Sequence, residues 1–249
     1  MLHWTVPHFP FESAAVSRIV MSISQLPDEQ SLPLTLAGLA EPIDGLREAG
    51  QLFHSRGWSV GTSSNYSVVL QGEPLELLVT ASGKDKGRLR RSDFVRVGAD
   101  GRPEPADQPK ASAETMLHVV LAERGDVGAI LHTHSVWGTL LSNCFFERGS
   151  LRIAGYEMLK GLEGIKTHDT SIEVPIFENT QDIPALADEV KRRLLDAAQR
   201  APHGFLIRRH GLYTWGRDLE EARRHIEVFE FLFECVARDL MLNRAATGL

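Results

Sequence analysis

The chain has 249 residues, of which 43% are hydrophobic and 24% charged, and it is long enough to bury a substantial core. Its formal net charge of −6 comes without a basic block, which argues against a nucleic-acid-binding protein. No apolar run reaches the length of a membrane span, so we expect no membrane association. Two cysteines are too few for a disulfide framework and favour a reducing cytoplasm.

The first 20 residues lack the basic and long apolar regions of a signal peptide. Met21 could be the natural start of the protein, which would make residues 1–20 an extension that is not part of it. We therefore expect a single domain over residues 21–249, without internal repeats.

Strand and helix patterns alternate along the chain, which is typical of an α/β protein. In the first half we expect a helix over 41–57, a hairpin of strands 66–70 and 75–80, a strand at 94–97, and a helix from an N-cap at Ser112 to Gly125. Later we expect a strand at 127–131, a helix at 136–144, a short helix or turn within 155–164, a strand at 172–177, a helix capped by Asp182, strands at 205–207 and 212–215, and a final helix from Asp218. Pro175 predicts that strand 172–177 is an edge or bulged strand.

The segment from Asp126 to Ser135, DVGAILHTHS, carries the most informative chemistry. A short apolar run predicts a buried strand, and His132 and His134 lie two residues apart at its end, so their imidazoles share one face. The best candidate for a third ligand is His210, which follows another apolar strand and precedes Gly211. Three neutral imidazoles suit a catalytic Zn²⁺ with one open position, although iron, nickel or manganese would also accept them.

Three loops of small polar residues adjoin the predicted elements. They contain Asn65, the pair Ser82-Gly83 followed by Lys84, and Ser112. Backbone N–H groups and hydroxyls in such loops bind anions, and a nearby lysine adds positive charge. Ordinary turn chemistry explains each loop singly, whereas the three together make a phosphate site an equally good interpretation.

Two glutamates are candidates for a general acid or base beside the metal. Glu114 lies in the first turn of the helix that precedes the histidine strand, and Glu157 lies in the segment YEMLKG. A solvated surface side chain is the commoner role for either one. His118, on the same helix as Glu114, is expected to be packed or at the helix surface rather than a ligand.

This order of segments resembles the class II aldolase and adducin family, whose enzymes use zinc to act on sugar phosphates, over about residues 41–240. The segments LHTHS, YEMLKG followed by VPIFENT, and LIRRHGLYTWGRDLEEA followed by FEFLF most resemble dehydratases of that family. The resemblance implies a three-layer α/β/α sandwich around a mainly antiparallel sheet. It also implies one Zn²⁺ per subunit and a homotetramer with the active site near a subunit boundary.

The resemblance also implies roles by position. His132, His134 and His210 match the zinc ligands, and Glu157 matches the general acid/base of the dehydratases. The phosphate-holding positions match Asn65, Ser82, Gly83 and Ser112. Glu114 stands where the aldolases carry their catalytic glutamate and some dehydratases a cysteine, so the division of labour between the two glutamates stays open.

The reaction implied is loss of water from a ketose phosphate in methionine salvage. One alternative is an aldolase or epimerase acting on another sugar phosphate. A more remote alternative is a non-enzymatic scaffold like adducin.

Overall fold

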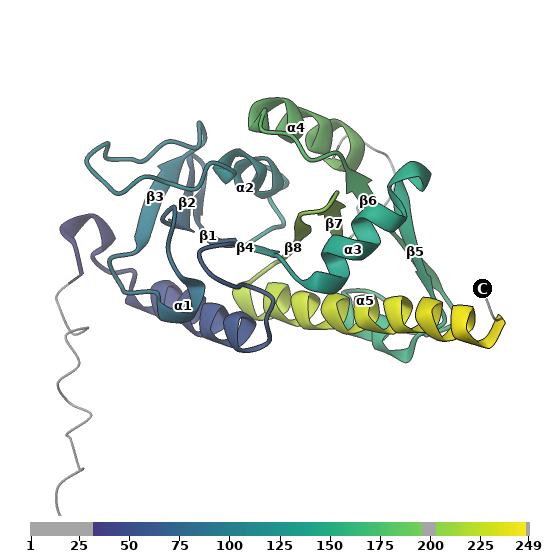
Figure 1. Cartoon of the computed structure of the whole chain (residues 1–249). Helices are drawn as coiled ribbons and strands as arrows, with labels where there is room; N and C mark the ends of the chain where they lie inside the picture. The colour runs from purple at the N-terminus through teal and green to yellow at the C-terminus, as the bar shows by residue number, and fades with distance from the viewer. Residues whose placement is uncertain (1–31, 196–202, 248–249) are drawn as a thin grey trace, which may run out of the picture. The chain divides into compact units, whose positions relative to one another are not determined.

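The computed structural model of the protein describes residues 32–195 and 203–247, which lie in one compact unit (Figure 1). The expected extension at residues 1–20 and the boundary at Met21 lie outside the described residues, so they stay predictions. Among the helices of the described part, none combines the length and the apolar character that a membrane span requires.

Eight strands of the described residues form one sheet in the order β3-β2-β1-β4-β8-β7-β6-β5. They are β1 (Asn65–Gly72), β2 (Leu75–Thr80), β3 (Phe94–Gly98), β4 (Ala129–Thr133), β5 (Ser150–Ala154), β6 (Ser171–Phe177), β7 (Gly204–Ile207) and β8 (Gly211–Gly216). Neighbouring strands pair antiparallel, except that β6 and β7 pair in parallel. The mainly antiparallel sheet that the family resemblance implied is therefore confirmed.

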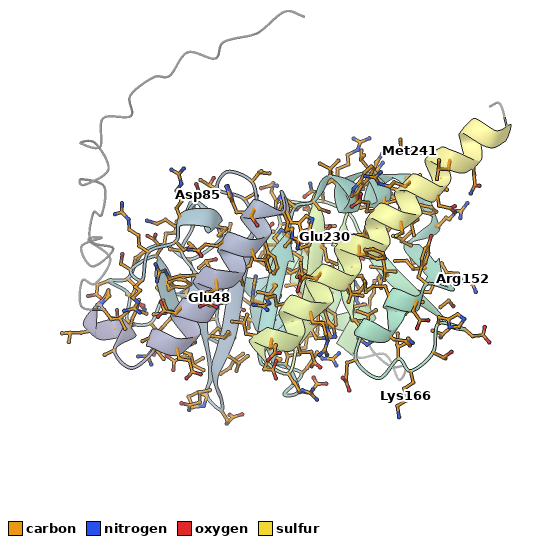
Figure 2. All side chains as sticks on the ribbon, turned by 90° about the horizontal axis from the view of Figure 1, so that it is seen from below. Glu48, Asp85, Arg152, Lys166, Glu230 and Met241 are labelled. Carbon is orange, nitrogen blue, oxygen red and sulfur yellow. The ribbon has the colours of Figure 1, made fainter. Side chains whose placement is uncertain are left out.

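Helices cover both faces of this sheet and make it the central layer of three (Figure 1). One face carries α1 (Ala40–Ser55), α3 (Val136–Cys144) and α5 (Leu219–Thr247), and the other carries α2 (Thr115–Ala122) and α4 (Ile183–Val190). Shorter turns are η2 (Leu34–Leu36), η3 (Lys86–Arg88), η4 (Phe146–Arg148), η5 (Glu157–Gly161) and the π-helical η6 (Lys191–Leu195). Figure 2 shows α1 and α5 side by side on their face of the sheet.

Side chains of β4 alternate between two apolar clusters, because successive residues of a strand point to opposite faces. Leu131 lies in the cluster under α1, α3 and α5, and Ile130 lies in the cluster under α2 and α4. Both side chains are fully buried. This alternation sends His132 toward α2 and Thr133 toward α5.

The structure corrects the start of α2. The expected N-cap was Ser112, but the helix begins at Thr115 with Glu114 at the N-cap position. The carbonyl of Ser112 accepts from the Thr115 N–H, and its hydroxyl accepts from the Glu114 N–H at 3.3 Å. Ser112 therefore closes a tight turn before the helix, which brings Glu114 to the helix end.

The structure also corrects the place of β6, which is not an edge strand. It lies between β5, a strand that hydrophobic patterning missed, and β7. Pairing with β7 involves only Ile176 and Phe177, beyond Pro175. The proline therefore needs to give no N–H to that ladder, and a central strand tolerates it.

Gly211 offers a test of how closely β4 and β8 approach. A Cβ on Gly211 would lie 2.0 Å from the carbonyl oxygen of Thr133, so an alanine would push the strands apart. We expect Gly211→Ala to lower the free energy of unfolding by about 1–3 kcal/mol, as overpacking does. Urea unfolding measures it.

The matched control is Gly72→Ala, because a Cβ there meets nothing within 4 Å. We expect this variant to stay within about 0.5 kcal/mol of the wild type. Equal stability of the two variants would contradict the close approach of the strands.

Candidate metal centre and adjoining pocket

Three side chains from adjacent strands form a row across the middle of the sheet. In the strand register, Asn65 of β1 and Tyr213 of β8 both stand opposite His132 of β4. The Tyr213 ring stacks on the His132 ring, with centroids 4.0 Å apart and planes 12° from parallel. His132 is fully buried, so this row fixes the orientation of its imidazole.

Hydrogen bonds determine which nitrogen of His132 is available to a ligand. Its Nδ1 lies 2.9 Å from the carbonyl oxygen of Leu212, which can only accept, so Nδ1 carries the proton. Its Nε2 therefore presents a lone pair, 2.8 Å from Nε2 of His134. The backbone N–H of His134 donates to the Trp58 carbonyl at 2.7 Å, which fixes the main chain just beyond β4.

The turn between β7 and β8 presents His210. Arg209 adopts a positive φ of 52° in this turn, and its N–H donates to the Ser142 hydroxyl. The hydroxyl of Thr139 donates to the His210 carbonyl at 2.9 Å. Helix α3 thus holds a strained turn in place and points His210 back toward β4.

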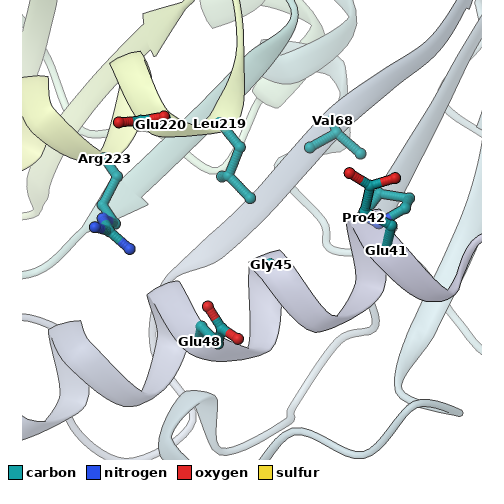
Figure 3. A pocket seen from close by; sticks show the side chains of 8 residues that line it. All are labelled: Glu41, Pro42, Gly45, Glu48, Val68, Leu219, Glu220 and Arg223. Carbon is teal, nitrogen blue, oxygen red and sulfur yellow. The ribbon is translucent and has the colours of Figure 1, made fainter.

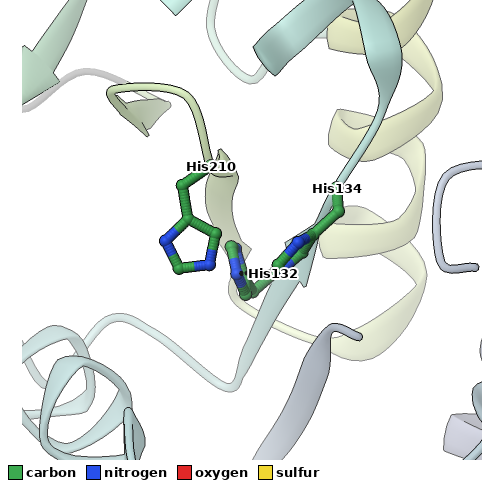
Figure 4. Close-up of side chains that lie close together, drawn as sticks. All are labelled: His132, His134 and His210. Carbon is green, nitrogen blue, oxygen red and sulfur yellow. Dashed lines mark hydrogen bonds between the residues drawn. The ribbon is translucent and has the colours of Figure 1, made fainter. Parts of the chain in front are cut away.

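The three imidazoles point toward one another (Figure 4). One nitrogen from each of His132, His134 and His210 lies within 4.8 Å of the others, and within residues 32–195 and 203–247 this is the one group of side chains placed to hold a metal ion. Burial lowers the pKa of His134 to about 4 and holds that of His132 well below its usual range, so both rings are neutral at pH 7. Nδ1 of His210 is buried without a hydrogen-bond partner. Three convergent imidazoles, those of His132 and His134 neutral at pH 7, fit a divalent cation.

Glu114 lies directly beside this centre. One carboxylate oxygen is 3.3 Å from Nε2 of His210 and the other is 3.6 Å from Nε2 of His132. That second oxygen accepts from the Asn65 amide at 2.7 Å and from the Tyr213 hydroxyl at 2.9 Å. Burial, followed by the charge of Glu114, raises the pKa of Tyr213 well above its usual value, so the phenol stays a donor.

A pocket of about 270 Å³ opens beside the histidines. Its lining includes seven residues that the sequence singled out: Asn65, Ser82, Gly83, Ser112, Glu114, His134 and His210. It also includes Asn179, Thr180 and Gln181 from the loop after β6, to which the sequence gave no role. The three polar loops expected to hold an anion thus meet at one cavity.

The lysine that lines this pocket is not the one expected from the sequence. Lys84, expected to add charge to its loop, forms an ion pair with Asp93 at 2.8 Å and does not line the pocket. Lys86 lines it instead, although its residue is only 1% exposed, and its ammonium donates to the Lys84 carbonyl. Burial lowers the pKa of Lys86 to about 8, which leaves it mostly charged at pH 7.

Glu157 is not brought together with these residues in a single chain. It lies in η5, where its exposed carboxylate forms an ion pair with Lys160 and lies 3.2 Å from Nδ1 of His168. Neighbouring Gly161 packs on Val228 of α5, and the Gly161 carbonyl accepts from Arg224. Glu157 therefore lies on a turn that packs against α5, and it does not line the histidine pocket.

A larger pocket, of about 570 Å³, lies elsewhere (Figure 3). It lies between α1 and the start of α5, and its charged lining residues are Glu41, Glu48, Glu220 and Arg223. It contains none of the residues around the histidines. The chemistry therefore points to the smaller pocket.

Comparison with known proteins agrees with this geometry. Residues 44–237 match the family model described as the class II aldolase and adducin N-terminal domain. The chain belongs to this family, and the predicted resemblance is confirmed.

Among relatives, the methylthioribulose-1-phosphate dehydratase of Marinobacter nauticus is 46% identical, over 79% of this chain and 93% of the relative. That of Pseudomonas fluorescens is 45% identical, over 82% and 94%.

Solved structures show the same fold at lower identity. An L-fuculose 1-phosphate aldolase superposes with a TM-score of 0.64 at 20% identity, covering 81% of this chain and 88% of the other. That of Thermus thermophilus gives 0.63 at 24%, covering 83% and 96%.

Glu230 supports the histidine strand from the opposite side of the sheet. It lies on α5 (labelled in Figure 2), is 2% exposed, and accepts from the Thr133 hydroxyl at 3.0 Å. Its second oxygen is buried without a hydrogen-bond partner. Burial raises the pKa of Glu230 from 4.5 to about 7.

This shift predicts a pH-dependent cost in stability. Between pH 4.5 and about 7 the unfolded chain releases the Glu230 proton while the folded chain keeps it, so stability falls as the pH rises. The cost approaches about 3 kcal/mol at pH 8, at about 1.4 kcal/mol per pKa unit. We expect the free energy of unfolding of Glu230→Gln, relative to that of the wild type, to rise by about 2–3 kcal/mol from pH 5 to pH 8. Urea unfolding of the metal-free proteins measures it.

Glu234→Gln on the same helix is the control, because the Glu234 side chain is 44% exposed and paired with Arg238. Its stability should follow the wild type across this range. A Glu230→Gln profile parallel to the wild type would show that the carboxyl titrates normally.

Proposed function

We propose that the chain is a zinc-dependent methylthioribulose-1-phosphate dehydratase of methionine salvage, acting in the cytoplasm as a homo-oligomer. The observation that carries this proposal is the convergence of His132, His134 and His210 beside a pocket that holds a carboxylate and a buried lysine. Relatives of that name, 45–46% identical over most of both chains, support it.

The substrate would be 5-methylthioribulose 1-phosphate, a ketose phosphate. A bound divalent cation supplies a Lewis acid that polarises the C2 carbonyl and acidifies the C3 proton. The chain's own residues must then remove that proton and protonate the C4 hydroxyl as it leaves. The atoms balance as one water lost, and the resulting enol becomes the 2,3-diketone.

Glu114 is suited to take the C3 proton. Its carboxylate lies against two of the three histidines, and donors from Asn65 and Tyr213 hold it there. A positioned general base contributes about 10²–10⁴-fold to the rate. Because both donors hold one oxygen, the other remains directed toward His210 and the reacting atoms.

Glu157 is proposed as the acid that protonates the leaving hydroxyl. Since it does not line the pocket of its own chain, this role requires η5 of a second copy to approach the pocket. A homo-oligomer with sites at its subunit boundaries meets that requirement, and the tetramer implied by the family is one such assembly.

The phosphate would bind where the polar loops meet. Ser82, Gly83 and Ser112 offer hydroxyls and backbone N–H groups, and Lys86 offers a positive charge. Because Lys86 is buried, its ion pair with the phosphate would form in a medium of low dielectric constant, which weakens the attraction little. Holding the phosphate there would fix the reacting carbons beside the histidines, which is a positioning effect.

An aldolase or epimerase acting on another sugar phosphate is the second candidate. The contact of Glu114 with the metal centre favours it, because such a carboxylate alone can move a substrate proton. The three convergent histidines weigh against a non-enzymatic scaffold.

The direct test is turnover by purified protein. With Zn²⁺ and 5-methylthioribulose 1-phosphate we expect the diketone, identified by mass spectrometry as substrate less one water. Chelation should abolish turnover and Zn²⁺ should restore it. Cleavage of L-fuculose 1-phosphate without dehydration would favour the aldolase instead.

Lys86→Met tests the anion site. Losing a buried charged partner costs about 1.5–3 kcal/mol, so we expect KM for the phosphate ester to rise about tenfold or more. Lys84→Met is the matched control, because Lys84 pairs with Asp93 outside the pocket, and its KM should change by less than about twofold. Equal effects of the two variants would remove Lys86 from the site.

Mixing two inactive variants tests whether Glu157 acts across a subunit boundary. Glu157→Gln and His210→Ala should each be nearly inactive alone. Dissociated and reassembled together, they form sites that pair an intact histidine centre with an intact Glu157, so activity should reappear. Persistent inactivity of the mixture, with mixed oligomers verified by mass spectrometry, would contradict the role in a second subunit.

A further inference from the structure

A chain of buried polar groups runs behind Glu114 from a residue to which the proposed reaction gives no role. His118 lies on α2, is 0% exposed, and is not a member of the metal-binding group. Its Nδ1 lies 2.7 Å from the Ser67 hydroxyl, and its Nε2 contacts the side-chain oxygen of Asn65. Asn65 in turn contacts Glu114.

The carboxylate of Glu114 determines the direction of every bond in this chain. Because a carboxylate only accepts, Asn65 must face it with its amide N–H, which leaves the amide oxygen facing His118. His118 must therefore donate from Nε2, and its Nδ1 accepts from Ser67. With Glu114 ionised, this one arrangement of protons satisfies the side chains of Ser67, His118, Asn65 and Glu114.

Burial supports this arrangement. It lowers the pKa of His118 to about 3, so the ring is neutral and carries one proton, as the pattern requires. The ring also packs edge-on against Tyr213, at 5.7 Å between centroids and 72° between planes. His118 is thus held both by ring packing and by its two nitrogens.

An amide can turn its oxygen or its nitrogen toward a neighbour at little steric cost. With the oxygen toward Glu114, Asn65 would place a dipole of the wrong sign against a buried carboxylate. In the tautomer whose Nδ1 accepts from Ser67, His118 carries its proton on Nε2, and this N–H donates to the amide oxygen and opposes the flipped amide. The histidine therefore acts on Glu114 through Asn65.

We propose that His118 is a positioning residue that locks the Asn65 amide with its N–H toward Glu114 and so aims the Glu114 carboxylate at the reacting atoms. This inference rests on the proposed function, in which Glu114 takes the substrate proton. Residues that orient groups at a metal centre typically contribute about 10–100-fold to activity.

Two substitutions of His118 separate this role from a structural one. A glutamine places its amide N–H near the position of Nε2, so His118→Gln keeps the donor to Asn65 and loses the contact with Ser67. An asparagine places its amide near Nδ1, so His118→Asn keeps the contact with Ser67 and loses the donor. Both variants bury one amide in place of the ring, so their structural costs are similar.

We expect His118→Asn to lower kcat by about 10–100-fold with KM changed less than about threefold and metal content unchanged. His118→Gln should keep kcat within about threefold of the wild type. Crystal structures should show Glu114 in contact with Asn65 in the glutamine variant and displaced from it in the asparagine variant.

A kcat of His118→Gln that is equal to or lower than that of His118→Asn would overturn the proposal. Failure of the proposed function shows differently, as a wild-type protein that does not turn over the substrate. The crystal structures then test the inference alone, and an unmoved Glu114 in His118→Asn would reject it.

Discussion

The pairing of β4 with β1 and β8 is the constraint on which the site depends. It places Asn65, His132 and Tyr213 in one row, all facing α2. A slip of one residue in either pairing would turn a member of this row to the opposite face, toward α5. Burial of β4 on both faces resists such a slip, because Leu131 and Ile130 would exchange one packed cluster for the other.

The row also explains why so many polar side chains tolerate burial. An unpaired buried polar group costs about 1–3 kcal/mol, and nearly every group here has a partner. Ser67, His118 and Asn65 satisfy one another in a single direction that ends at Glu114.

Sequence reasoning reached the parts of the site that depend on local pattern. The spacing of His132 and His134 showed a shared face, and small-residue loops marked the pocket. It did not reach the parts that depend on register between distant strands, such as Tyr213, or on the packing of a short turn, which buries Lys86 instead of Lys84. Glu157 was one of two candidate acids or bases and was matched to the dehydratases by resemblance, but a single folded chain does not bring it to the pocket.

X-ray absorption at the zinc edge is the sharpest test of the histidine centre, because it reports the atoms bound to the metal in the intact protein. We predict one zinc per chain with three imidazole nitrogens at about 2.0–2.1 Å and one oxygen from water. The His210→Ala form should lose one of the nitrogens. Sulfur ligands, or a zinc environment that His210→Ala leaves unchanged, would contradict the convergence of these three histidines on one cation.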